Sequence, residues 1–310
     1  MFKLGFTLTA PVVFVLCSIC AAIVPAQSSQ RFVSARLGRD FYPCTVQLPC
    51  RTFAAALQQV PPRGEIIALD AGDYGPATIT KAVTIAGPVG GQAGIRVGSG
   101  PAVTIDAGPT DIVVLRGLTI NGSGLRGPLQ IPEAPGVLFR TGEALHIENC
   151  VINGFFGGGI HFGGAGQLFV KDTIVRNCTR AGIEIGPGTG KAIASIDHCR
   201  LEKNERGVAA SGAVQLTVRD SVAAGNEDAG FSAGALAVVV LGNCVATGNE
   251  FGISAIGGFA GSPTVYVSNS TIANNNVGLR SIQSGLLSRA NNTVEANREN
   301  GSFTGTFQAK

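Results

Sequence analysis

Charged residues that alternate in sign recur along the chain at intervals of 23, 26 and 22 residues. They are Glu148, Lys171, Asp197 and Arg219. In one interpretation they form an active site, in which Lys171 or Arg219 removes a proton beside the carboxylate of a uronate sugar. The two carboxylates and the nearby His146 would then supply acid–base groups or bind a cation. The other interpretation is structural, because opposite charges on neighbouring strands attract each other by ~0.2–1 kcal/mol per pair. The alternating sign favours the structural interpretation.

His161 and Glu184 are a second pair of residues that could bind a ligand or take part in catalysis, and they are separated by the same interval of 23 residues. An exposed histidine commonly has a charged partner, so a simple ion pair is favoured over metal binding or catalysis. Tyr266 is a third candidate for ligand binding, although three tyrosines and no tryptophan leave few aromatic rings to stack against sugars. We therefore treat His161, Glu184 and Tyr266 as candidate binding residues.

The N-terminal segment has the composition of a secretory signal peptide. Lys3 precedes an apolar run over residues 4–24, and Pro25 and Ala26 supply a helix breaker and a small residue at the expected cleavage point. An uncleaved membrane anchor is the alternative, because the apolar run is nearly long enough to span a bilayer. Cleavage after Ala26 is favoured, and it predicts a secreted, periplasmic or cell-surface protein without a membrane span.

Six cysteines remain after this cleavage, and two of them are close in sequence. Cys44 and Cys50 lie in a loop with Pro43 and Pro49, so a disulfide is expected in an oxidising compartment. A metal-binding pair is the alternative, but no histidine lies near them. The remaining cysteines are expected to be free thiols, and these are Cys150, Cys178, Cys199 and Cys244.

The chain contains an internal repeat of about 24 residues that begins near residue 144. Seven small anchor residues mark the copies, namely Cys150, Thr173, Cys199, Ser221, Cys244, Ser270 and Asn292. The residue before the anchor is Asn or Asp in every copy except one, where it is His198, and in the next copy it is Asp220. Five residues after the anchor an asparagine recurs, as Asn204, Asn226, Asn249, Asn275 and Asn297. A glycine follows each anchor by eight or nine residues, as Gly159, Gly182, Gly207, Gly230, Gly252, Gly278 and Gly301.

The repeat unit predicts stacked strands. Each copy contains three short stretches that alternate apolar and polar residues, and such strands can bury a face only by stacking in parallel ~4.8 Å apart. Stacked asparagines would bond one another and tolerate left-handed backbone at a turn. The glycines would supply positive φ or allow close backbone approach.

This pattern resembles the right-handed parallel β-helix of the pectin-lyase-like superfamily, whose asparagine ladder the five asparagines reproduce. The resemblance covers residues 65–305. It implies an all-β fold, a single right-handed parallel β-helix (solenoid) with a short N-terminal capping helix. Residues 144–303 should form seven coils.

The register also assigns faces to the side chains. Leu145 and Ile147 should point into the core, whereas His146 and Glu148 should point outward, because side chains alternate along a strand. Three of the free cysteines share one inward column on alternate coils, about 9.6 Å apart, which is too far for a disulfide. Cys178 should begin the asparagine column instead.

Three segments are predicted along the chain. They are a signal peptide over residues 1–26, a cap over 27–64 and the β-helix over 65–310. In the cap, Thr52 can begin a helix over residues 53–60 that ends at Pro61, and this helix would cover the strand edges of the first coil. Residues 125–136 contain three prolines and should loop out of the coil.

Composition and motifs exclude several classes of function. Charged residues make up 14% of the chain and the net charge is +3, with lysine and arginine scattered, so no nucleic-acid partner is expected. Neither the aspartate group and paired arginines of pectate lyases nor the Asn-Thr-Asp and Gly-His-Gly motifs of polygalacturonases are present. We therefore expect an exported, non-catalytic protein, either a surface or matrix component or a glycan-binding scaffold, without a metal or cofactor. The alternative is a polysaccharide lyase or glycoside hydrolase acting on uronate-rich polysaccharide, and only the lyase would use Ca²⁺ as a cofactor.

Overall fold

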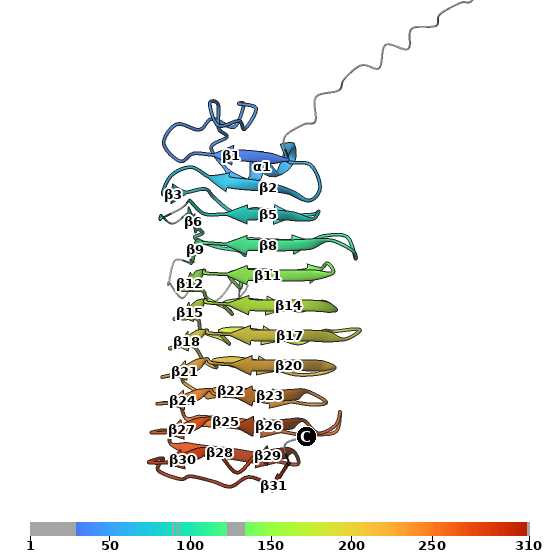
Figure 1. Cartoon of the computed structure of the whole chain (residues 1–310), viewed down its shortest axis with the longest axis vertical. Coiled ribbons are helices and arrows are strands. Elements are labelled where there is room, and N and C mark those ends of the chain that lie inside the picture. The colour runs from blue at the N-terminus through green and yellow to red at the C-terminus, as the bar shows by residue number, and fades with distance from the viewer. Residues whose placement is uncertain (1–28, 89, 92, 123–133, 309–310) are drawn as a thin grey trace, which may run out of the picture.

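The computed structural model describes residues 29–308 apart from 89, 92 and 123–133. The predicted signal peptide and residues 125–133 of the predicted excursion lie outside the described residues. Within them the chain winds into one parallel β-solenoid, and successive coils stack along its long axis in the order of the sequence (Figure 1). The described residues include no helix that is long and apolar enough to cross a membrane.

Three parallel sheets form the walls of the solenoid. Sheet A has twelve strands, which are β1 (Gln30–Val33), β2 (Gly64–Ala68), β5 (Val83–Ala86), β8 (Ile112–Arg116), β11 (Ala144–Glu148), β14 (Gly166–Lys171), β17 (Ala192–Asp197), β20 (Val214–Arg219), β23 (Val238–Gly242), β26 (Thr264–Ser268), β29 (Gly285–Ser288) and β31 (Gly305–Thr306). Sheet B has ten strands, which are β3 (Gly72–Asp73), β6 (Ala93–Arg96), β9 (Leu118–Asn121), β12 (Val151–Asn153), β15 (Ile174–Arg176), β18 (Arg200–Glu202), β21 (Val222–Ala224), β24 (Val245–Thr247), β27 (Thr271–Ala273) and β30 (Thr293–Glu295). Sheet C has nine strands, which are β4 (Ala77–Ile79), β7 (Val103–Asp106), β10 (Val137–Thr141), β13 (Ile160–Phe162), β16 (Ile183–Ile185), β19 (Val208–Ala210), β22 (Ala229–Gly234), β25 (Phe251–Ile256) and β28 (Val277–Ile282).

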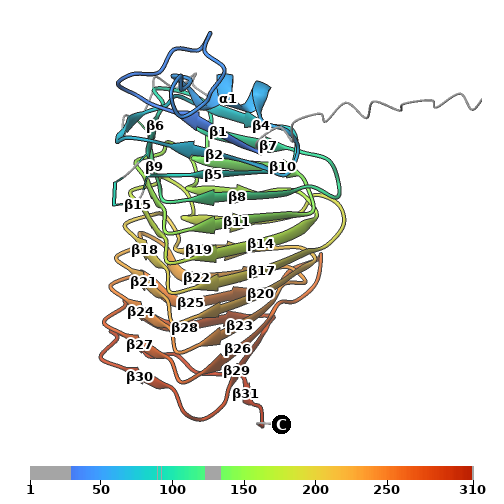
Figure 2. The same cartoon turned by 45° about the horizontal axis from the view of Figure 1, so that its top comes forward.

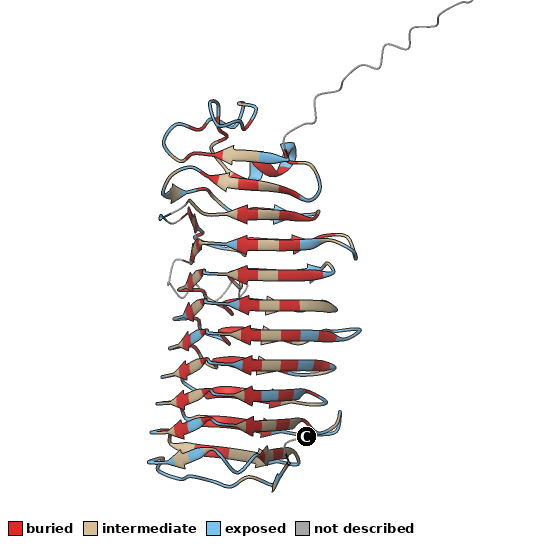
Figure 3. Cartoon of the chain, viewed as in Figure 1, coloured by how far each residue is buried: buried red, intermediate tan, exposed pale blue. Residues whose placement is uncertain are grey.

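The predicted β-helix and its register are confirmed. Seven strands of sheet A, from β11 to β29, correspond to the seven predicted coils, although the last coil contributes only an isolated bridge at Glu299 to sheet C. Leu145 and Ile147 are fully buried, and their neighbours His146 and Glu148 lie outward and partly exposed. Burial alternates in this way along strand after strand (Figure 3).

The asparagine column forms a buried ladder. The side-chain amide of Asn226 donates to Oδ1 of Asn249 at 2.9 Å, and Asn249 and Asn275 repeat this bond with the next residue of the column at the same distance. Asn204 joins the ladder through its backbone N–H, which donates to Oδ1 of Asn226 at 3.1 Å. Cys178 begins the column, as predicted, because its N–H donates to Oδ1 of Asn204. Each buried amide therefore satisfies polar groups on adjacent coils.

The left-handed backbone predicted for the ladder asparagines needs correction. The ladder asparagines are not left-handed, because the positive φ belongs to the residue before each of them, such as Lys203 at 54° and Asn274 at 58°. The glycine column serves close backbone approach, one of the two roles predicted for it, and Gly301 also has a positive φ of 69°. A Cβ on Gly207, for example, would lie 2.4 Å from the carbonyl oxygen of Gly230 on the next coil.

The anchor column alternates thiols with hydroxyls, and this alternation has a hydrogen-bonding function. The backbone N–H of Cys199 donates to Oγ of Ser221 at 3.0 Å, and that of Cys244 donates to Oγ of Ser270 at 3.1 Å. Cys150, Cys178, Cys199 and Cys244 are buried free thiols, as predicted. Burial raises the pKa of each of these four thiols to about 11.

The N-terminal end of the solenoid is covered by the helix α1 (Phe53–Gln59) and a disulfide-bonded loop (Figure 2). Thr52 caps the helix, since its hydroxyl accepts from the N–H of Ala55 at 3.2 Å. Phe53 buries its ring against Tyr74, with the two centroids 4.8 Å apart. The predicted disulfide joins Cys44 to Cys50, whose Cα atoms are 4.6 Å apart. Ahead of α1, the strand β1 pairs with β2 and begins sheet A.

Candidate functional site

A hollow of about 570 Å³ lies on the outer face of sheet C, over the strands β10, β13 and β16. Its lining combines the apolar side chains of Pro101, Pro135 and Leu138 with polar groups. The polar groups belong to His161, Arg180 and Glu184. An apolar wall with a few convergent polar groups is the usual character of a small-ligand site.

Strand register places the central pair of this hollow. His161 is the middle residue of β13 and Glu184 is the middle residue of β16, and the two are direct partners in the parallel pairing. Their neighbours on β13, Ile160 and Phe162, point into the core and are fully buried, so both polar side chains must point outward. Nδ1 of His161 lies 3.0 Å from Oε2 of Glu184, and the side chains are 37% and 35% exposed.

The electrostatics of the pair keep Glu184 ionised. The hydrogen bond from His161 lowers the pKa of the Glu184 carboxyl, and the positive charges of His161, Arg180 and Arg206 act in the same direction against its partial burial. With Nδ1 paired to the carboxylate, the second ring nitrogen, Nε2, lies beside the backbone of Gly163, where a Cβ would be 3.0 Å from it. The pair therefore offers an ionised carboxylate and an oriented imidazole to the hydroxyl groups of a bound molecule.

The sequence missed three features of this hollow. Arg180 belongs to the turn before β16, and Pro101 belongs to the turn before β7. Neither lies in a repeat column, so no periodic signal marked them. Leu138 was equally unmarked, although it is the direct strand neighbour of His161 on β10.

The candidates on sheet A lie on a different wall of the solenoid. Glu148, Lys171, Asp197 and Arg219 end the successive strands β11, β14, β17 and β20, and each is the register partner of the next. Among the described residues, however, no ion pair within 4.0 Å links any two of these four. The predicted charge ladder is therefore wrong as a set of ion pairs, because Asp197 turns instead to the adjacent His198, with Oδ1 and Nδ1 3.1 Å apart.

The two remaining candidates pack against aromatic rings. His146 stacks on Phe169 of the next coil, with centroids 4.6 Å apart, and burial lowers the pKa of its imidazole even though Glu148 acts in the opposite direction. Tyr266 packs its ring edge against Phe307 near the C-terminal end of sheet A. Since His161 and Glu184 are on sheet C, the structure does not bring Tyr266 into their hollow.

One group in the described part of the chain has the donor set of a metal site. Asp197, His198 and Asp220 each offer one ligand atom, and these atoms all lie within 4.8 Å of one another. Asp197 ends β17, whereas His198 and Asp220 occupy equivalent turn positions on neighbouring coils, with φ of 50° and 49°. The preference of this turn for left-handed residues explains why Asn and Asp dominate the column.

Comparison with known structures supports the fold. The chain is similar to the A-module of a mannuronan C-5 epimerase from Azotobacter vinelandii, with a TM-score of 0.58 and 16% identity over 77% of this chain and 70% of that one. It is also similar to a pectate lyase, with a TM-score of 0.53 and 14% identity over 84% of this chain and 67% of that one. XylC in complex with xylose gives a TM-score of 0.51 and 7% identity over 85% of this chain and 67% of that one. At these identities the likeness concerns the fold alone.

At the level of sequence, no curated protein matches the chain. A family model does match it. The model describes a right-handed β-helix region and aligns with residues 135–304, which is more than half of the chain. The chain therefore belongs to the right-handed β-helix family.

Proposed function

We propose that this protein is an exported, non-catalytic β-helix that binds a glycan in the hollow of sheet C. The observation that carries the proposal is the His161–Glu184 pair inside a partly apolar hollow of about 570 Å³. Sugars present hydroxyl groups at their edges and apolar C–H faces, and the hollow offers partners for both in one place.

The chemistry of the hollow favours binding over cleavage. Glycoside hydrolysis generally requires two carboxyl groups on either side of the bond, one of them protonated. Among the described residues that line the hollow, Glu184 is the only carboxylate, and its lowered pKa keeps it ionised. It is therefore suited to accept hydrogen bonds and unsuited to act as a general acid.

The class of ligand and the export are further parts of the proposal. Structurally similar proteins include a mannuronan epimerase and a pectate lyase, whose names refer to polysaccharides, and these support a polysaccharide ligand here. The disulfide between Cys44 and Cys50 supports export, because such bonds persist in oxidising compartments.

The test is a binding titration with oligosaccharides of mannuronate, galacturonate and xylose, alongside neutral glucans. We expect at least one saccharide to bind. His161→Ala and Glu184→Gln should each weaken binding by roughly tenfold or more, because each removes a hydrogen bond that involves a charged group. His198→Asn, which alters a histidine on another wall of the solenoid, is the matched control and should bind as the unaltered protein does.

Two results would contradict the proposal. Either no saccharide of the panel binds, or the His161 and Glu184 variants bind with unchanged affinity. Chromatography of the incubated saccharides tests the non-catalytic part, since release of shorter products by the unaltered protein would favour the polysaccharide lyase or hydrolase alternative.

A further inference from the structure

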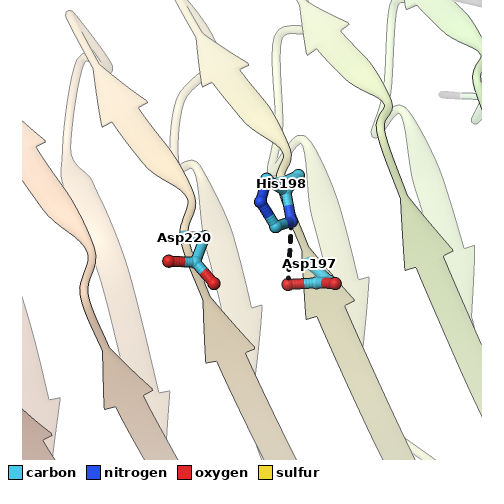
Figure 4. A group of neighbouring side chains, drawn as sticks. All are labelled: Asp197, His198 and Asp220. Carbon is cyan, nitrogen blue, oxygen red and sulfur yellow. Dashed lines mark ion pairs between the residues drawn. The ribbon is translucent and has the colours of Figure 1, made fainter.

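Asp197, His198 and Asp220 meet at the turn that leads from sheet A to sheet B (Figure 4). The two aspartates come from neighbouring coils, so the group exists only because β17 and β20 stack in register. The backbones of the two coils are hydrogen-bonded at this turn, since the N–H of His198 donates to the carbonyl oxygen of Arg219 at 3.2 Å. Three side chains with metal-ligating atoms are thus held at one edge by the solenoid itself.

The backbone at this edge leaves the side chains free to adjust. His198 and Asp220 are exposed, and Asp197 is half-buried. Metal–ligand distances of about 2.0–2.2 Å on a tetrahedron put ligand atoms roughly 3.4 Å apart. Nδ1 of His198 and Oδ1 of Asp197 are already 3.1 Å apart, and the three ligand atoms lie within 4.8 Å of one another. Rotation of the side chains is therefore sufficient to bring all three atoms to the spacing that a tetrahedral metal ion requires.

The second aspartate is oriented from the other side. The side-chain amide of Asn243, in the same turn column, donates to Oδ1 of Asp220. The amide of Asn269 donates in turn to Oδ1 of Asn243 at 3.2 Å. This chain of amides ends on Oδ1 of Asp220 and holds the carboxylate from one side, as an outer-shell partner does in a metal site.

The basic residues on the neighbouring strands do not form a close ion pair with Asp197 in the described structure. Lys171 and Arg219 are the register partners of Asp197 on the two neighbouring strands, yet within the described residues neither forms an ion pair with it at 4.0 Å or less. Asp172 adds a further negative charge, since it precedes His198 by one coil in the same turn column. The carboxylate of Asp197 is therefore available to the imidazole and to a cation.

We propose that Asp197, His198 and Asp220 bind a divalent transition-metal ion of the Zn²⁺ class, with water completing the coordination. An imidazole nitrogen together with two carboxylate oxygens is a ligand set that suits Zn²⁺ and its neighbours, whereas Ca²⁺ prefers a shell of oxygens alone. This site is separate from the hollow on sheet C and does not depend on the glycan proposal.

The other two histidines of the chain supply an internal comparison. His146 stacks on Phe169, and His161 faces the single carboxylate of Glu184. Only His198 has two carboxylates within reach in the described structure. The four free cysteines are at most 3% exposed and cannot compete for a metal in the folded protein.

The experiment is a Zn²⁺ titration of the folded protein without a polyhistidine tag, followed by calorimetry and by NMR of the three imidazole rings. One equivalent should bind, and only the ring signals of His198 should shift. His198→Asn and Asp220→Asn should each weaken binding by roughly tenfold or more, a loss that even an outer-shell partner can cause. Asparagine already occupies the column at Asn243 and Asn269, so both variants should keep the fold, and their melting temperatures without metal verify this.

His161→Asn is the matched control, because it removes a histidine that also faces a carboxylate, and it should bind Zn²⁺ as the unaltered protein does. The proposal is overturned if the unaltered protein shows no saturable binding. It is equally overturned if His161→Asn loses as much affinity as His198→Asn.

Discussion

Nδ1 of His161 and Oε2 of Glu184 are 3.0 Å apart, although 23 residues separate them in the chain. The distance follows from parallel stacking, which makes the two residues direct partners on β13 and β16. Any two outward residues one coil apart are brought together in this way. The pair lies within a hollow whose other walls come from the strand residue Leu138 and from turns.

The pair should contribute to stability in a way that depends on pH. The hydrogen bond from His161 lowers the pKa of Glu184 below its usual 4.5, so the ionised carboxylate stabilises the fold above that value. This contribution is lost as the pH falls through the lower, folded-state pKa. Glu184→Gln should therefore destabilise at pH 7, by under about 1 kcal/mol for a pair this exposed, and should have no effect in strong acid.

Thermal unfolding at neutral and acidic pH measures this difference. Glu227→Gln is the control, because Glu227 is an exposed glutamate on another turn. A Glu184→Gln effect that persists undiminished in strong acid would contradict the assignment.

The asparagine ladder should be a major source of stability. Asn249 accepts from the N–H of Asn226 and donates to the carbonyl oxygen of Ala223, both in the buried interior of the turn. Asn249→Leu should destabilise by roughly 1–3 kcal/mol, because these buried groups lose their partners. Denaturant unfolding measures the change. Asn276→Leu, which removes a hydrogen bond to the exposed Glu250 carboxylate, should cost under about 1 kcal/mol, and equal effects at both sites would argue against the ladder.

Adding a methyl group at the glycine column should destabilise the fold. A Cβ on Gly207 would lie 2.4 Å from a carbonyl oxygen of the next coil, so Gly207→Ala should destabilise by about 1–3 kcal/mol. Gly188 has no atom within 4 Å of the corresponding position, and Gly188→Ala is therefore the control. Melting temperatures that fall equally in both variants would show that close approach is not the reason for the column.

The cysteines should divide into two classes on chemical labelling. The four buried thiols, whose pKa is raised to about 11, should not react with a thiol reagent at pH 8 until the protein unfolds. Cys44 and Cys50 should be recovered as one disulfide-linked peptide. Mass spectrometry after labelling in native and denaturing buffer measures both, and labelling of Cys44 without prior reduction would refute the bond.

Reversing the charges on sheet A should have little effect on stability. The fourfold change is Glu148→Lys, Lys171→Glu, Asp197→Lys and Arg219→Glu. Since no ion pair within 4.0 Å joins these described residues, the free energy of unfolding should change by at most about 1 kcal/mol. Glycan binding in the sheet C hollow should be unchanged. Loss of a polysaccharide-cleaving activity in this variant, with the fold retained, would instead place an active site on sheet A.

The sequence alone determined the β-helix, because its constraints repeat. A stacked strand needs apolar residues at alternate positions, and a buried turn needs a group such as the amide of Asn249 that both donates and accepts. Each requirement recurs on every coil, so columns such as Asn226 and Asn249 are visible as a period without any knowledge of distance. The same period predicted that His161 and Glu184 would be neighbours.

The tertiary structure decided which neighbours interact and where a ligand could lie. Register brings Lys171 beside Asp197, but rotation of exposed side chains directs Asp197 to His198 instead, and periodicity carries no information on rotation. Apart from Leu138 on β10, the walls of the hollow come from turns whose length and composition vary from coil to coil, such as those of Pro101 and Arg180. A repeating pattern specifies the stack of coils, whereas a site depends on the irregular turns and side-chain torsions that the pattern leaves open.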